Sequence, residues 1–139
     1  MKKAHFFAVV SSIFIMGMSG CNGLAEIETF DGVDWPSNFN SQGVAVKTVL
    51  TNTDKSTHLV TIKGQEKPHY HDQHDLFAYV TQGNVKIHFK NRTEFLEVGD
   101  TVMIPKGTYH WAENTNADAS NMVVVFTPPF DKKDRRFVD

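Results

Sequence analysis

Between residues 44 and 127, short runs of alternating apolar and polar residues follow one another at regular spacing. The run over residues 84–90 is the clearest, because three apolar residues alternate with lysines and a histidine. Alternation with period two is typical of strands that bury one face. Turn residues around Gly83 and Gly99 separate the runs, and no long amphipathic helix pattern occurs. The sequence therefore predicts an all-β domain, either a sandwich or a barrel.

The chain has 139 residues, a formal net charge of −2 and one cysteine. This length suits a single domain. Basic residues do not cluster with interleaved aromatic residues, so the composition does not indicate nucleic acid as a partner. One cysteine permits no disulfide within the chain. An apolar core must therefore hold the fold together, and a bound metal ion would add to its stability.

Residues 1–20 have the pattern of a bacterial lipoprotein signal peptide. Two lysines precede an apolar run over residues 6–18, which is too short for a transmembrane helix. The segment that ends in Ser19, Gly20 and Cys21 then resembles the bacterial lipobox. The resemblance implies cleavage before Cys21, diacylglycerol on its sulfur and an acyl group such as palmitate on its amino terminus. The alternative is a plain secretory signal with an incidental cysteine.

Lipidation would anchor the protein in the bacterial cell envelope, facing the periplasm. Asn22 follows the cysteine. An Asp at that position is the usual inner-membrane retention signal in enteric bacteria, so its absence favours the outer membrane. Residues 21–43 would then form a lipidated tether and N-terminal arm, and residues 44–127 the barrel. Residues 128–139 would form a charged C-terminal tail, whose two phenylalanines are candidates for packing back onto the barrel.

The second half of the chain contains a spaced motif made of Gly99, Pro105, Gly107, His110 and Asn114. Gly99 turns the chain into a strand, the Pro-x-Gly segment turns it back, and His110 lies on the returning strand. This motif resembles the second conserved motif of the cupin superfamily, position for position. The resemblance implies a single cupin domain, which is a jelly-roll-like β-barrel.

The first half of the chain resembles the first cupin motif, in which a His-x-His segment precedes a Glu and then a Gly. Here the segment is His69 to His71, and the Gly is Gly83. Two histidines that are two residues apart on a strand point to the same face. The resemblance implies that these histidines and His110 bind a divalent transition metal such as Fe, Mn, Zn, Ni or Cu inside the barrel.

The first motif departs from the family at the position of the Glu ligand, where this chain has Leu76. Leucine cannot bind a metal. A bulge before Gly83 would turn the carboxylate of Asp75 inward, and otherwise His74 is the nearer candidate. The sequence therefore leaves two alternatives: a fourth ligand from Asp75 or His74, which would also be the candidate catalytic base, or a site with three histidines alone.

The remaining histidines of the predicted barrel are interpreted as surface residues. His88 shares its strand face with two lysines, and His58 begins a strand. Tyr70, Tyr109 and Trp111 alternate with the candidate ligands, so they should pack on the opposite face of their strands.

The resemblance implies two functions. The first is a metal-dependent enzyme of the oxygenase, isomerase or lyase type that acts on a small organic molecule, such as a sugar or an organic acid. The second is a non-catalytic module that binds a metal or a small ligand at the cell envelope, and the missing Glu ligand favours it. Many small cupins dimerise through strand exchange or sheet stacking, which makes a homodimer one expectation for this chain.

Overall fold

A computed structural model describes residues 35–139, in which every regular element is a strand. The predicted signal peptide and the lipidation site at Cys21 lie outside the described residues. Within them, no helix is long and apolar enough to cross a membrane. The strands are β1 (Val44–Thr51), β2 (Ser56–Ile62), β3 (His69–His71), β4 (Asp75–Gln82), β5 (Val85–Phe89), β6 (Thr93–Leu96), β7 (Thr101–Ile104), β8 (His110–Asn114), β9 (Ser120–Thr127) and β10 (Arg135–Phe137).

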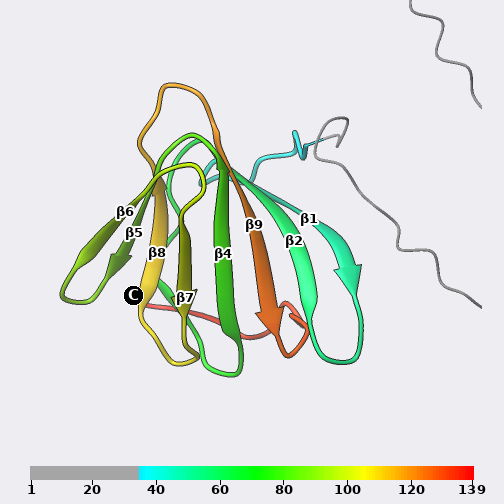
Figure 1. The fold of residues 1–139 in the computed structure, drawn as a ribbon. Coiled ribbons are helices and arrows are strands. Elements are labelled where there is room, and N and C mark those ends of the chain that lie inside the picture. Colours follow the sequence, from blue (N-terminus) through cyan, green and yellow to red (C-terminus); the bar gives the residue numbers. More distant parts are fainter. Residues whose placement is uncertain (1–34) are drawn as a thin grey trace, which may run out of the picture. The chain divides into compact units, whose positions relative to one another are not determined.

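The strands form two antiparallel sheets, with the orders β1-β2-β9-β4-β7 and β10-β3-β8-β5-β6. In Figure 1, β9 lies between β2 and β4, although β4 ends at Gln82, β2 ends at Ile62 and β9 begins only at Ser120. Such long-range pairing is typical of jelly rolls. The architecture confirms the prediction of an all-β, jelly-roll-like barrel.

One apolar core joins the two sheets. On β4 the buried residues Leu76, Ala78 and Val80 alternate with the exposed Phe77 and Tyr79. The inward residues of both sheets meet in one cluster, which includes Ile62, Val80, Met122 and Val124 from the first sheet and Val85, Ile87 and Ala112 from the second. Burial of this apolar surface is the main force that closes the barrel.

The turn between β4 and β5 requires a glycine. Gly83 has φ +73°, and a Cβ at this position would lie 2.4 Å from the hydroxyl oxygen of Ser120. This explains why the turn that ends the first predicted motif contains glycine.

The end of the tail forms a strand that the sequence did not predict. β10 pairs with β3, so that Arg135, Arg136 and Phe137 lie opposite His71, Tyr70 and His69. Before it, Phe130 packs against the apolar core. A three-residue strand with two arginines has no apolar alternation, so only its pairing with β3 reveals it.

The prediction of a surface position for His58 was wrong. His58 is 4% exposed, and its ring lies edge-on to Phe126 and Phe130. It faces inward because it shares its face of β2 with Val60 and Ile62, which belong to the apolar core. His88 does face outward. Its ring stacks on that of Trp111 with the ring centroids 4.5 Å apart, and its Nε2 atom lies 2.6 Å from a carboxylate oxygen of Glu113.

Candidate metal centre

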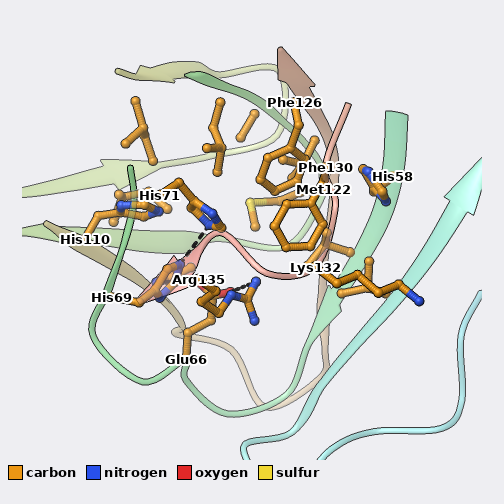
Figure 2. A pocket seen from close by; sticks show the side chains of 18 of the residues that line it. His58, Glu66, His69, His71, His110, Met122, Phe126, Phe130, Lys132 and Arg135 are labelled. Carbon is orange, nitrogen blue, oxygen red and sulfur yellow. Dashed lines mark hydrogen bonds and ion pairs between the residues drawn. The ribbon is translucent and has the colours of Figure 1, made fainter. Parts of the chain in front are cut away.

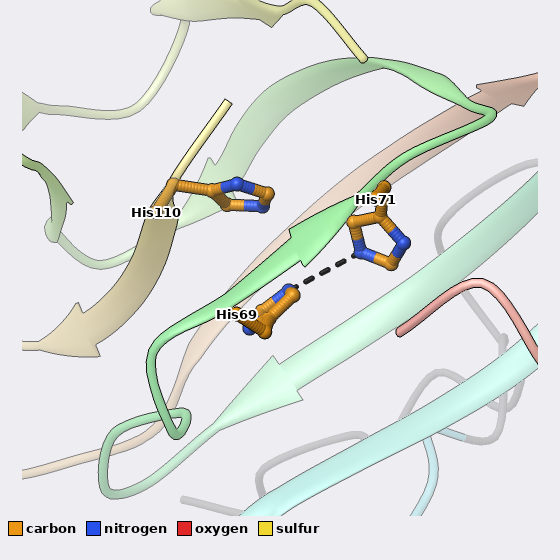
Figure 3. A group of neighbouring side chains, drawn as sticks. All are labelled: His69, His71 and His110. Carbon is orange, nitrogen blue, oxygen red and sulfur yellow. Dashed lines mark hydrogen bonds between the residues drawn. The ribbon is translucent and has the colours of Figure 1, made fainter. Parts of the chain in front are cut away.

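The three predicted ligand histidines come together on two neighbouring strands. His69 and His71 lie on β3, and His110 begins β8 directly opposite His69. All three are nearly inaccessible to solvent, at 1%, 1% and 3% exposure. Tyr70, between the first two, points to the other face and contacts Tyr109. Figure 3 shows how the alternation of β3 and its pairing with β8 turn the three rings toward one another.

The spacing of the ring nitrogens fits ligation of one ion. Donor atoms of the three histidines lie within 4.8 Å of one another, and the Nε2 atoms of His69 and His71 are 3.2 Å apart. Two nitrogen ligands at about 2.1 Å from an ion, separated by about 90–109°, are about 3.0–3.4 Å apart. The pair therefore already has the separation that a shared ion requires.

The electrostatics of the site favour neutral imidazoles. Burial, together with the neighbouring His69 and His110, lowers the pKa of His71 to about 3. Burial also lowers the pKa of His110 to about 4 and lowers that of His69. A metal ion binds the neutral form of histidine, so protons compete weakly for this site.

Two of the ligands have a fixed tautomer. His69 donates from Nδ1 to the carbonyl of Lys67 at 2.7 Å, and His110 donates from Nδ1 to the carbonyl of Thr108 at 2.8 Å. In both rings the lone pair is therefore on Nε2, facing the other histidines. The donor set, its burial and its tautomers fit a divalent transition metal.

The histidines form part of the wall of a cavity of about 530 Å³ between the two sheets. Apolar side chains provide most of the remaining wall, among them Leu76, Ile87, Ile104, Met122, Val124 and Phe126. The tail adds Phe130, Lys132 and Arg135, and the loop before β3 adds Glu66 (Figure 2). The cavity is therefore mainly apolar, with a few polar groups near the histidines, as in many small-molecule sites.

Glu66 and Arg135 form the polar side of the cavity, and sequence reasoning missed both. One oxygen of Glu66 lies 3.7 Å from the guanidinium of Arg135, and the other accepts the backbone N–H of Ala112 at 3.1 Å. Arg135 reaches the cavity from β10, which carries no sequence signal of its own. The sequence does place Glu66 only three residues before the candidate ligand His69, and this closeness pointed to a position near the site.

The structure does not bring Asp75 to the three histidines. Its side chain is exposed, and its carboxylate accepts the backbone N–H of Lys106 at 2.8 Å. The register of β4 shifts only between Val80 and Gln82, so Asp75 remains outward and Leu76 faces the cavity. The role of Asp75 as a ligand or a catalytic base stays a prediction.

His74 is buried beside the site but is engaged elsewhere. One ring nitrogen, Nδ1, contacts the carboxylate of Asp134, and the other, Nε2, lies 3.0 Å from the carbonyl of Pro129. Donor atoms of His71, His74 and Asp134 also lie within 4.8 Å of one another. As a fourth ligand or a base, His74 likewise stays a prediction.

Comparisons with known proteins agree with this architecture. Residues 58–126 match the family described as a cupin domain, Cupin_2. An uncharacterized protein of Aquifex aeolicus (strain VF5) is 39% identical over 79 residues, which cover 57% of this chain and 64% of the relative. The match thus spans less than two thirds of that protein.

Two solved structures have a similar fold. KdgF from Halomonas sp. is 29% identical with a TM-score of 0.60, over 65% of this chain and 83% of KdgF. Pac13 from Streptomyces, described as a unique nucleoside dehydratase, is 17% identical with a TM-score of 0.63, over 72% of this chain and 82% of Pac13. At that identity, the likeness to Pac13 concerns the fold alone.

The lowered pKa values predict that the metal-free protein is less stable in acid. His71 and His110 have pKa values of about 3 and about 4 when folded, against 6.5 ordinarily. Between those values the unfolded chain binds protons that the folded chain does not, so the free energy of unfolding falls as pH falls. Thermal melts of the metal-free protein from about pH 7 to about pH 4.5 should show a decreasing Tm.

Replacement of both histidines by glutamine should make that pH dependence shallower. An equally steep decrease in the double variant would show that other groups cause it.

Proposed function

Because residues 58–126 of this barrel match the Cupin_2 family, we propose that the protein is a metal-dependent enzyme acting on a small organic molecule. His69, His71 and His110 would bind one divalent transition ion. The observation that carries the proposal is the convergence of three buried imidazoles, with lowered pKa values, on the wall of a cavity of about 530 Å³. Three protein ligands that leave further positions open are the pattern of catalytic sites, whereas structural sites are closed.

The bound ion would supply Lewis-acid or oxygen-activating chemistry, as in oxygenases, isomerases or lyases. The protein's own part is to hold and shield the substrate. The mainly apolar walls of the cavity would exclude water from around a bound substrate. Exclusion of water strengthens every polar contact with the bound molecule.

The polar groups of the cavity favour a substrate with an acidic group, such as an organic acid or an acidic sugar. Lys132 and Arg135 line the cavity, and Glu66 is the one carboxylate among its lining residues. The Nε atom of Arg135 is buried and has no hydrogen-bond partner within residues 35–139. A carboxylate could accept from this guanidinium while a neighbouring oxygen reaches the metal.

A non-catalytic binding module is the second candidate function. Leu76 favours it, since this apolar residue lines the cavity at the position where the family usually has a Glu ligand. The description of Pac13 as a nucleoside dehydratase supports an enzyme on the same fold, but a fold alone assigns no reaction.

Metal analysis of the purified full chain tests the site. We expect about one transition-metal ion per chain. His110→Ala and His71→Ala should each lose the ion and lower the Tm, because each removes a ligand and the binding energy stabilises the fold. Asp75→Asn is the control, and it should keep the wild-type metal content because Asp75 is outside the three-histidine site.

Full metal content in both histidine variants would overturn the site. If the site holds, a panel of organic acids, sugars and their neutral analogues separates the two functions. Turnover that requires the metal supports the enzyme, and metal or ligand binding without turnover across the panel supports the binding module.

We also propose that the protein is a lipoprotein of the bacterial cell envelope that faces the periplasm. The support is the sequence of residues 1–21 alone, which ends in the only cysteine of the chain. Outer-membrane attachment is favoured because Asn22, and not Asp, follows Cys21.

Labelling of a bacterial host with a palmitate analogue should mark the wild-type protein, and Cys21→Ser should lose the label and leave the membrane fraction. Several acyl chains give stable anchoring, so the difference should be close to all-or-none. An unlabelled wild-type protein that is secreted in soluble form would instead support a plain secretory signal.

A further inference from the structure

The three candidate ligands differ in what holds the ring nitrogen that faces away from the metal. His69 and His110 each donate from Nδ1 to the carbonyl of the residue two positions earlier. The Nδ1 atom of His71 is also buried, but it has no hydrogen-bond partner within residues 35–139. A buried polar atom without a partner is costly, so this position requires an explanation.

The contact between His69 and His71 determines where His71 carries its proton. His69 donates from Nδ1, so its Nε2 is a bare acceptor, and Nε2 of His71 lies 3.2 Å away. In the ion-free protein, His71 therefore carries its proton on Nε2 and donates it to His69. To bind a metal through Nε2, His71 has to lose that proton and gain one on Nδ1. The number of bound protons does not change, but the new Nδ1–H group needs an acceptor.

The tail provides a buried anion beside the ring of His71. Donor atoms of His71, His74 and Asp134 lie within 4.8 Å of one another. The side chain of Asp134 is 4% exposed. Its negative charge acts to raise the pKa of His71, against the larger effect of burial. One of its oxygens accepts the backbone N–H of Gln73 and contacts His74, while the other accepts only the N–H of Asp72. The second oxygen thus keeps capacity for a further donor.

His74 and two backbone groups hold this carboxylate as an anion. The Nδ1 atom of His74 contacts one carboxylate oxygen of Asp134, and its Nε2 atom faces the carbonyl of Pro129. Burial raises the pKa of Asp134, but the hydrogen bonds from His74, Gln73 and Asp72 outweigh it, so that pKa lies below its usual value. A buried carboxylate that accepts several hydrogen bonds can persist as an anion.

We propose that Asp134 is a positioning residue for the metal ligand His71, accepting its Nδ1–H group directly or through one water molecule. Asp134 thereby stabilises the tautomer that offers Nε2 to the ion, as the backbone carbonyls do for His69 and His110. The inference rests on the metal site of the proposed function. It gives the tail a role in metal affinity, because Asp134 comes from the segment just before β10.

Titration of the metal-free full chain with Co²⁺ against a competing chelator tests this role. Asp134→Asn should weaken Co²⁺ binding by about 10- to 100-fold, the usual effect of losing such a partner. It should also change the Co²⁺ absorption spectrum, and Asp134→Glu should restore part of the affinity. Arg136→Gln is the matched control, because it breaks the Arg136–Asp72 ion pair that also joins the tail to the segment after His71 but keeps the Asp134 carboxylate, so its affinity should not fall.

Unchanged Co²⁺ affinity in Asp134→Asn would overturn the proposal. An equal loss in Arg136→Gln would also overturn it, because Asp134 would then act only by anchoring the tail. A wild-type chain that binds no Co²⁺ would instead contradict the metal site itself.

Nitrogen NMR of the wild-type imidazoles provides a test that requires no variant to fold. On addition of Zn²⁺, the proton of His71 should move from Nε2 to Nδ1, while His69 and His110 keep theirs on Nδ1. Coordination of Zn²⁺ through Nδ1 of His71 would contradict the proposal.

Discussion

The pairing of β3 with β8 is the constraint on which the candidate site depends. β3 is only three residues long, and its alternation turns His69 and His71 to the same side. The register then places His110 directly opposite His69. A shift of one residue in this register would turn the imidazole of His110 to the outer face of the sheet, where Tyr70 now lies. Three ligands from two distant motifs therefore depend on one strand pair.

The segments around this pair complete the site. The first sheet closes the cavity with apolar side chains from β2, β4 and β9. On the other edge of β3, β10 brings Arg135 to the cavity, and Asp134 just before it accepts the backbone N–H groups of Asp72 and Gln73, directly after His71. The tail is thus joined to the metal strand through both its backbone and its side chains. Its sequence position, at the end of the chain, gives no hint of this central placement.

The sequence predicted what depends on local patterns. Alternation and turn residues revealed most of the barrel strands, and the two spaced motifs identified the histidines that the structure brings together. Predictions failed where burial comes from distant segments. His58 was misplaced because β2 is covered on both faces, which removes the usual alternation. β10 and Arg135 were missed because only the folded chain brings them beside β3, where Arg135 meets Glu66.

The central claim is that His69, His71 and His110 together bind one ion, and X-ray absorption at the edge of the bound metal tests it most directly. Three imidazoles on one ion should give three nitrogen scatterers at about 2.0–2.1 Å, with the outer-shell pattern of histidine rings. His110→Ala should reduce that number by one or remove the metal altogether. A wild-type spectrum dominated by oxygen ligands, without imidazole scattering, would contradict the account.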